Sequence, residues 1–286
     1  MVSERSLTTD DVSQCLALSD AAGWNQVEDD WRFILERGDA HGLVVDGRIV
    51  ATAAIMPYRH RFAWICMVLV AEDQRRRGHA THLLHWATEA SARRGLVAGL
   101  DATPAGREVY RRMGFRDIYG LTRMETAVGH ANRSGLARPS GEADTISIVQ
   151  ASDLAEIAAF DAPRFGADRA DLLAFLYGRA PKAAFLARRN GEISGFCLAR
   201  PGQRATQIGP VVATDENTAI SLFAAGISAL EAPIFCDVAD RHEALHEFLR
   251  AHGLRSQRPF TRMLMDRGSP LDQPEKIFAL TGPEFG

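Results

Sequence analysis

At 286 residues, the chain is long enough for two domains of about 150 residues each. Its hydrophobic content of 46% and charged content of 24% are those of a globular protein. A net charge of −3 and a pI of about 6.3 do not provide the basic surface of a general nucleic-acid binder. Residues 1–11 lack the apolar core of a signal peptide, and no apolar run approaches about 18 residues, so we expect a cytoplasmic protein without membrane contact.

The four cysteines are isolated from one another in the sequence. Cys15, Cys66, Cys197 and Cys236 are far apart and lie mostly in apolar runs. This placement is typical of buried free thiols and differs from the spacing of metal ligands or of a disulfide framework. We therefore expect no metal site and no disulfide.

The first 128 residues alternate between strand and helix patterns. Asp46-Gly47 separates two apolar runs, which is a strong hairpin signal. Gly95 and Gly114 each follow a helical pattern and are expected to end it. In chain order we predict a strand at 2–7, a helix from Thr8 or Thr9 to about 22, a second helix with Val27, Trp31, Ile34 and Leu35 on one face, strands at 42–45, 48–55 and 61–70, a helix to about 94, a strand at 96–102, a short helix from Thr103-Pro104 to Met113, and one or two strands over 115–124.

The second half repeats this order. Asn190-Gly191 takes the place of Asp46-Gly47, and Phe-Thr-Arg-Met at 260–263 matches Leu-Thr-Arg-Met at 121–124. Because such matches keep their order along the chain, they indicate two copies of one fold. We predict strands at 145–149, 184–188, 192–199, 207–212 and 234–238, and helices after Ser152 or Asp153, around 169–177, from about Glu216, and ending near Gly253.

The composition between the two copies shifts to Gly, Ser, Arg, Pro and Ala, which is typical of a linker. The expected fold class is α/β, an α+β arrangement with a mixed sheet, present twice in tandem. The predicted boundaries are a first domain at 1–128, the linker at 129–143, a second domain at 144–268 and a C-terminal tail at 269–286.

The stretch from Ile65 to Ala80 joins a buried strand to a helix. Its apolar run ends at Val70, and Arg75-Arg76-Arg77-Gly78-His79-Ala80 precedes residues with helical spacing. A helix N-terminus has unpaired N–H groups and a partial positive charge, and a glycine lets the backbone approach a ligand. The loop is therefore a candidate site for a phosphorylated ligand, although an arginine run also occurs on solvated surfaces. Neither of the two commoner phosphate-loop motifs is present.

Together with Tyr110-Arg111-Arg112-Met113-Gly114-Phe115, this loop resembles the GNAT superfamily of N-acetyltransferases. The family loop has the form Gln/Arg-x-x-Gly-x-Gly/Ala, which Arg75, Gly78 and Ala80 fill. The resemblance covers about 43–124 strongly. The second half resembles the same fold weakly, as in tandem-domain members.

The resemblance implies acetyl-CoA as co-substrate, with its pyrophosphate on the backbone N–H groups of the loop and its pantetheine arm along the preceding strand. Thr103 stands where family members often place a cofactor-contacting Asn, and this difference weakens that assignment. The implied cofactor-binding residues are Val68, Leu69, Val70, Arg75, Arg76, Arg77, Gly78, His79, Ala80, Thr81, Thr103 and Tyr110.

The resemblance also implies direct attack of a primary amine on the thioester, without a covalent enzyme intermediate. A thiolate with a reference pKa near 8.5 can take a proton from a phenol near 10, and Tyr110 is in the family position for that acid. The alternative for Tyr110 is a helix tyrosine that only packs. The base is harder to place: the family position is near Ala98, which leaves Asp101, Glu28 or an ordered water.

The acceptor is expected to be a small-molecule or peptide amine, bound on the face opposite the cofactor. Glu28, Asp29 and Asp30 are either solvated or directed at a cationic substrate. Since pockets often form between domains, the second copy is expected to cover this face. The candidate acceptor residues are Trp24, Glu28, Asp161, Arg169 and Asp237.

The second copy departs from the cofactor pattern, with Asn217 and Ile220 expected where Arg75 and Gly78 stand and Leu249 in place of Tyr110. We expect it to be non-catalytic. An acyl-CoA-binding sensor remains the main alternative to an enzyme, and a nucleotide-binding regulator is disfavoured by the missing phosphate motifs. Either a monomer or a homodimer fits the sequence.

Overall fold

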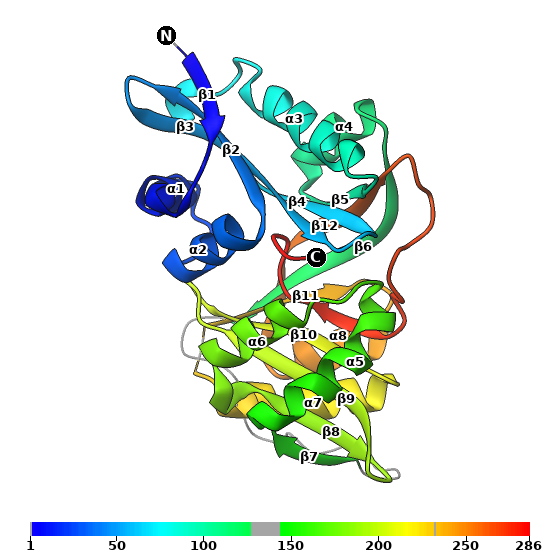
Figure 1. Ribbon diagram of the computed structural model, residues 1–286. Helices are drawn as coiled ribbons and strands as arrows, with labels where there is room; N and C mark the ends of the chain where they lie inside the picture. The colour runs from blue at the N-terminus through cyan, green and yellow to red at the C-terminus, as the bar shows by residue number, and fades with distance from the viewer. Residues whose placement is uncertain (1, 127–143, 232) are drawn as a thin grey trace.

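The computed structural model describes residues 2–126, 144–231 and 233–286, so most of the predicted linker lies outside the described residues. Its first half has the predicted order of elements, with 115–126 as one strand (Figure 1). The elements are β1 (Val2–Ser6), η1 (Thr9–Asp11), α1 (Val12–Ala21), α2 (Glu28–Arg37), β2 (Asp39–Val45), β3 (Arg48–Tyr58), β4 (Phe62–Val70), η2 (Glu72–Gln74), α3 (His79–Arg93), β5 (Val97–Ala102), α4 (Pro104–Arg112) and β6 (Phe115–Thr126).

The second half repeats this order and adds one strand at its end. The elements are β7 (Thr145–Ile148), η3 (Ala151–Asp153), α5 (Leu154–Phe165), α6 (Ala170–Arg179), η4 (Pro181–Ala183), β8 (Phe185–Arg189), β9 (Glu192–Arg200), β10 (Thr206–Ala213), α7 (Glu216–Ala229), β11 (Ile234–Ala239), α8 (Glu243–Ala251), β12 (Leu254–Met265) and β13 (Ile277–Leu280). We call β1–β6 with their helices the first repeat and β7–β12 with theirs the second repeat.

The two predicted hairpins have matching turns. Asp46 and Gly47 have φ values of 50° and 79°, and Asn190 and Gly191 have 54° and 86°. Two consecutive left-handed residues form the turn whose twist suits a hairpin, and Asp-Gly and Asn-Gly adopt it most easily. All four cysteines are buried free thiols, as predicted.

The repeats exchange their last strands within one 13-stranded sheet of order β1-β2-β3-β4-β5-β12-β6-β11-β13-β10-β9-β8-β7. β12 of the second repeat lies between β5 and β6, and β6 of the first repeat continues along β11. Figure 1 shows β6 running from the upper half of the molecule into the lower half. The matching motifs of the two repeats thus serve opposite halves: Arg123 on β6 reaches Asp237 on β11, and Arg262 on β12 reaches Asp101 on β5.

In each repeat, two parallel strands separate after a short pairing. β4 pairs with β5 only between Phe62–Trp64 and 97–99. β10 pairs with β11 only between Thr206–Gln207 and 234–235, and β13 then occupies the space between them, antiparallel to both. The first separation is left open by the strands, and the second is closed by β13.

Residues 269–286, predicted as a tail, are instead an integral part of the fold. After β13, the chain returns to the first repeat, where Tyr58 donates to the Phe285 carbonyl at 2.5 Å and Trp64 Nε1 donates to the Pro283 carbonyl at 2.9 Å. Phe285 is completely buried. The sequence did not indicate this placement because the segment contains three prolines and two glycines and has no counterpart in the first repeat.

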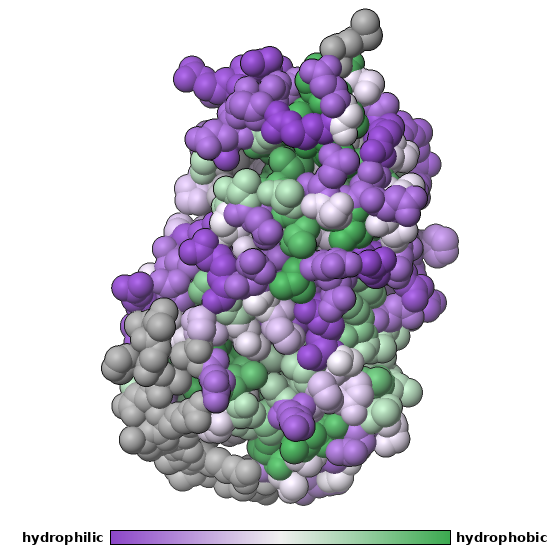
Figure 2. All heavy atoms as spheres, turned by 90° about the vertical axis from the view of Figure 1, so that its left-hand side faces the viewer, coloured by the Kyte–Doolittle hydropathy of each residue, from purple (hydrophilic) through white to green (hydrophobic). Residues whose placement is uncertain are grey.

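One hydrophobic core joins the two repeats, with Trp31, Phe196 and Phe285 among its members. Figure 2 shows apolar side chains along the middle of one face between polar margins. Among the described residues, the large apolar side chains that are strongly exposed are Val2, Val109 and Ile148, which lie on separate elements. None of the described helices combines the length and the apolar character needed to cross a bilayer.

Candidate active site

The loop before α3 presents a row of free backbone donors. Arg76 and Gly78 have left-handed φ values of 64° and 83°, and they turn the chain into the first residue of the helix, His79. Within the described part of the chain, the N–H groups from Arg76 to Thr81 have no acceptor, whereas His82 N–H already bonds to the Gly78 carbonyl at 3.0 Å. Such a concave row of N–H groups at a helix N-terminus binds anions.

The surroundings of this loop favour an anion as well. Arg75 and Arg77 reach only backbone carbonyls, those of Val70 and Asp73, at 3.4 and 3.5 Å. No carboxylate pairs with any of the three loop arginines among the described residues. No atom lies within 4 Å of the place where a Cβ on Gly78 would be, so a ligand has room to approach the backbone. The loop therefore fits a pyrophosphate in charge and in space.

A bulge in β4 faces the open separation. Met67 has a φ of 52°, and the register with β3 shifts between Thr52 and Ala54. Thr52 Oγ1 donates to the Met67 carbonyl at 2.8 Å and holds this conformation in place. A bulge re-aims the backbone of a strand and interrupts its pairing. Residues 65–68 of β4 consequently line a cavity of about 140 Å³, opposite 100–101 of β5 and Thr103.

Tyr110 faces the same cavity from α4. Thr103 caps this helix, since its Oγ1 accepts from Gly106 N–H at 3.3 Å, and a Cβ on Gly106 would lie 2.9 Å from the Tyr110 ring. The Tyr110 hydroxyl has no hydrogen-bond partner among the described residues, and burial raises its pKa. The phenol is thus protonated at neutral pH and free to donate.

Asp101 is held by an ion pair. Both carboxylate oxygens accept from Arg262, at 3.0 Å each, and the Asp101 side chain has no exposed surface. Burial raises the pKa of Asp101, while the Arg262 guanidinium acts in the opposite direction. Asp237 makes the same kind of pair with Arg123 in the repeat whose strands are closed. The Asp237–Arg123 pair forms although β13 closes the strands of that repeat. We therefore interpret the Asp101–Arg262 pair as a contact between exchanged strands and not as a proton-transfer group.

Of the other residues predicted to bind the acceptor, some lie at or next to the cavity and some lie away from it. Trp24 lines the cavity. Asp237 lies behind the cavity wall, bound to Arg123. Glu28 is on the outer side of α2, paired with Arg32 at 2.6 Å, and Asp161 and Arg169 form a separate buried pair. The structure does not bring these last three residues to the cavity.

Several cavity residues were missed by the sequence reasoning. Arg258 and Phe260 reach the cavity because β12 is inserted next to β5, and Pro283 and Glu284 reach it because the C-terminal segment folds back. Arg123 lines it from β6. The Thr-Arg-Met repeat could have pointed to β12, but nothing in the sequence indicates that the last strands are exchanged.

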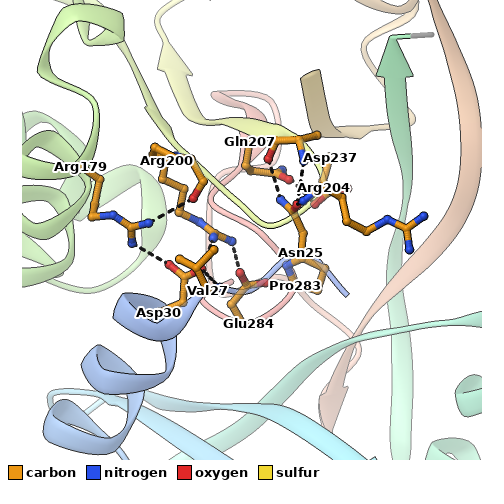
Figure 3. A network of polar contacts seen from close by, with 12 residues as sticks. Asn25, Val27, Asp30, Arg179, Arg200, Arg204, Gln207, Asp237, Pro283 and Glu284 are labelled. Carbon is orange, nitrogen blue, oxygen red and sulfur yellow. Dashed lines mark hydrogen bonds and ion pairs between the residues drawn. The ribbon is translucent and has the colours of Figure 1, made fainter. Parts of the chain in front are cut away.

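A buried polar network connects the cavity wall to the second repeat (Figure 3). Arg200 on β9 donates to Asp30 on α2 at 2.7 Å and also contacts Glu284. Asn25 accepts from the N–H groups of Arg204 and Ala205 at 2.9 and 3.0 Å. The prediction that Asp30 is solvated or faces a substrate is corrected, because its carboxylate is fully buried among arginines.

Comparisons with known proteins agree with this geometry. Residues 9–115 match the acetyltransferase (GNAT) family, and residues 157–279 match an acetyltransferase (GNAT) domain. The chain belongs to the GNAT family as a tandem member. The family supports an acyl-CoA-binding N-acetyltransferase.

Relatives cover nearly the whole chain. The uncharacterized N-acetyltransferase YitH of Bacillus subtilis (strain 168) is 21% identical over 96% of this chain and 95% of its own. A putative acetyltransferase from Pyrococcus horikoshii has a TM-score of 0.77 at 20% identity, covering 100% of this chain and 96% of that one. A tandem GNAT protein from the clavulanic acid biosynthesis pathway has a TM-score of 0.64 at 15% identity, covering 92% and 98%. The likeness to these two solved structures shows that the chain shares their fold.

The second GNAT domain has a different helix start from the first. Asp215 is the N-cap of α7, and its carboxylate accepts from Thr218 N–H at 2.9 Å. The expected match of Ile220 with Gly78 is therefore corrected: only 214–215 separate β10 from α7, and Ile220 lies inside the helix. A carboxylate thus stands where the first domain offers free N–H groups.

The second domain also lacks a counterpart of Tyr110. Leu249, which stands in the place of Tyr110, is completely buried in the hydrophobic core on α8. Together with β13 between β10 and β11, these features leave the first GNAT domain as the one with an open cleft among the described residues.

Proposed function

We propose that the protein is an acetyl-CoA-dependent N-acetyltransferase that acetylates a primary amine at a single site in the first GNAT domain. The observation that carries this proposal is the alignment of three features around one strand separation. The loop before α3 offers free N–H groups, β4 bulges beside the opening, and Tyr110 directs an unpartnered hydroxyl into the cavity.

Each of these features has a defined task in the transfer. Bound acetyl-CoA supplies a thioester whose carbonyl carbon is attacked by the amine. Backbone N–H groups at the bulge near Met67 stabilise the negative charge that develops on the carbonyl oxygen. Tyr110 donates its proton to the sulfur as the carbon–sulfur bond breaks, and recovers a proton from water. Val68, Leu69 and Val70 hold the pantetheine arm, and Arg76 to Thr81 hold the pyrophosphate.

The acceptor amine has to lose a proton before it attacks. Asp101 is an unsuitable base in this proposal, since both of its oxygens are bound to Arg262. Glu28 is too far out on α2 to line the cavity. We assign the proton transfer to water in the cavity. Thr103 acts here as a helix cap rather than as a direct cofactor ligand.

The test is a screen of primary amines with the full chain, in which release of free CoA thiol is followed and acetylated products are identified by mass spectrometry. At least one class of amine should stimulate thiol release. Calorimetry should give one acetyl-CoA site per chain. Binding of acetyl-CoA without amine-dependent thiol release would favour the sensor alternative.

A further inference from the structure

A row of charged side chains crosses three strands beside the cavity. Arg258 on β12 lies directly opposite Arg123 on β6, and Arg123 lies directly opposite Asp237 on β11. Residues that face each other across paired strands point to the same face of a sheet, and like charges in that position are destabilising. Each of the two arginines is therefore stabilised by an anionic group bound beside it.

Arg123 has taken that partner. It donates to both oxygens of Asp237, at 2.7 and 2.8 Å, and Gln207 Nε2 donates to the same carboxylate at 3.1 Å. The Arg123 side chain is 6% exposed and that of Asp237 is 1% exposed. Both oxygens of Asp237 are thus already bound, and no hydrogen bond joins Asp237 to Arg258 among the described residues.

Arg258 has no such partner. Its guanidinium has neither an ion pair nor a hydrogen bond within the described ranges, and its Nε is buried without an acceptor. The guanidinium carbon lies 4.8 Å from the centre of the Phe260 ring, a contact that orients it toward the cavity both residues line. Burial and the neighbouring Arg123 lower the pKa of Arg258. A half-buried, unpaired cation is costly unless a ligand neutralises it.

The remaining charges of the cavity wall are already paired. Asp101 is bound to Arg262, and one oxygen of Glu284 is bound to Arg200. The other oxygen of Glu284 is buried without a partner in the described part of the chain, so the wall carries one guanidinium and one carboxylate oxygen that lack a bound partner there. A carboxylate suits this wall better than a phosphate, because Glu284 repels a dianion more strongly than a monoanion.

We propose that the acceptor is an amine that also bears a carboxylate, and that Arg258 binds this carboxylate while the amine points toward the separation of β4 and β5. The inference rests on the proposed function and adds a substrate class to it. A planar guanidinium matches a carboxylate with two parallel hydrogen bonds, which makes Arg258 a specificity-determining residue. The cavity of about 140 Å³ suits a small amino acid head group.

The first experiment uses the unmodified protein and pairs of acceptors that differ only at the acid group, namely amino acids and ω-amino acids against their carboxamides. Rates are compared at equal concentrations of neutral amine. The carboxylates should have a kcat/KM higher by about 10- to 100-fold, since a hydrogen bond to a charged group has that worth. Equal values for acid and amide, or a preference for aminoalkyl phosphates, would overturn the inference.

The second experiment compares R258Q and R258K with R255Q, a control on the same strand whose arginine is exposed and bound to Glu125. R258Q should lower kcat/KM for the carboxylate acceptors about 10- to 100-fold and leave their carboxamides unchanged, and R258K should restore part of the loss. R255Q should change neither. If R258Q lowers acid and amide alike, Arg258 is merely structural and the inference fails.

Calorimetry with acetyl-CoA separates this failure from that of the proposed function. An enzyme that acetylates acids and amides equally keeps the proposed function and loses the inference. A protein that binds acetyl-CoA, acetylates neither set and also acetylates no other primary amine in the screen loses both.

Discussion

Both GNAT domains have a pair of parallel strands that separate at the same point of the fold. The separation is open in the first domain and filled in the second. In the first domain, β4 and β5 diverge around a cavity, and the following helix begins with free N–H groups near Gly78. In the second, β13 fills the divergence and Asp215 caps the helix. The fold alone therefore does not make a cofactor site. We infer that a cofactor site requires an unfilled separation together with unsatisfied donors.

The largest effect on the catalytic rate should come from Tyr110, which has no counterpart in the second domain. Tyr110→Phe removes the only acid that we assign, so kcat should fall about 10²- to 10⁴-fold while the affinity for acetyl-CoA stays nearly constant. Steady-state thiol release and calorimetry measure the two quantities. Tyr177→Phe, on α6 in the second domain, is the matched control and should leave both unchanged. A normal rate in Tyr110→Phe would mean that this tyrosine only packs.

The junction between the domains should dominate stability. Arg200→Met leaves Asp30 and Glu284 buried without their shared cation, which should lower the free energy of unfolding by about 3–5 kcal/mol. Arg188→Met, which breaks a more exposed pair with Glu156, should cost less than about 1 kcal/mol. Urea unfolding of the full chain gives both values. Equal losses would show that the buried network is not what joins the domains.

Making the first helix start resemble the second should weaken cofactor binding. Gly78→Asp puts a carboxylate where we place the pyrophosphate, and Gly78→Ala is the control because it shares the cost of a left-handed φ without the charge. The Kd for acetyl-CoA should rise about tenfold more in the aspartate variant than in the alanine variant. Conversely, Asp215→Gly should not create a second site, since β13 still fills the cleft. A second binding event in that variant would contradict the assigned role of β13.

The smallest effect concerns pH. Because burial raises the pKa of Tyr110 above its ordinary value near 10, its proton is kept to higher pH than that of a solvated phenol. The alkaline fall in kcat, measured with a weakly basic acceptor between pH 7 and 10.5, should therefore begin only above about pH 10. If the Tyr110→Phe variant lacks this alkaline fall in kcat, the fall is due to the ionisation of Tyr110. A fall centred below pH 9 in the unmodified protein would contradict the assignment.

The sequence was a good guide to what depends on local pattern. Asp46-Gly47, Asn190-Gly191 and the helix-stop glycines act within a few residues, so the hairpins and helix ends were predictable. The loop before α3 was found for the same reason, since its strand, glycine and helix are consecutive.

The acceptor side of the cavity depends on distant pairing and was not predictable. Arg258 lies beside the cavity only because β12 is inserted between β5 and β6. Glu284 is there only because the last residues fold back under Trp64. Periodicity shows which residues form a strand but not which strand is its neighbour, so Asp161 and Arg169 were as plausible as Arg258 on sequence alone.

The exchange of β6 and β12 also affects the order in which parts of the fold can form while the chain is being synthesised. When β5 and β6 have left the ribosome, the strand that belongs between them is still more than a hundred residues away. At about 5–20 residues per second, these two strand edges remain unpaired for on the order of ten seconds. The cavity beside β4 and β5 receives its last lining residues only with residues 283–284, so we expect a chain that ends before them to lack this part of the cavity wall.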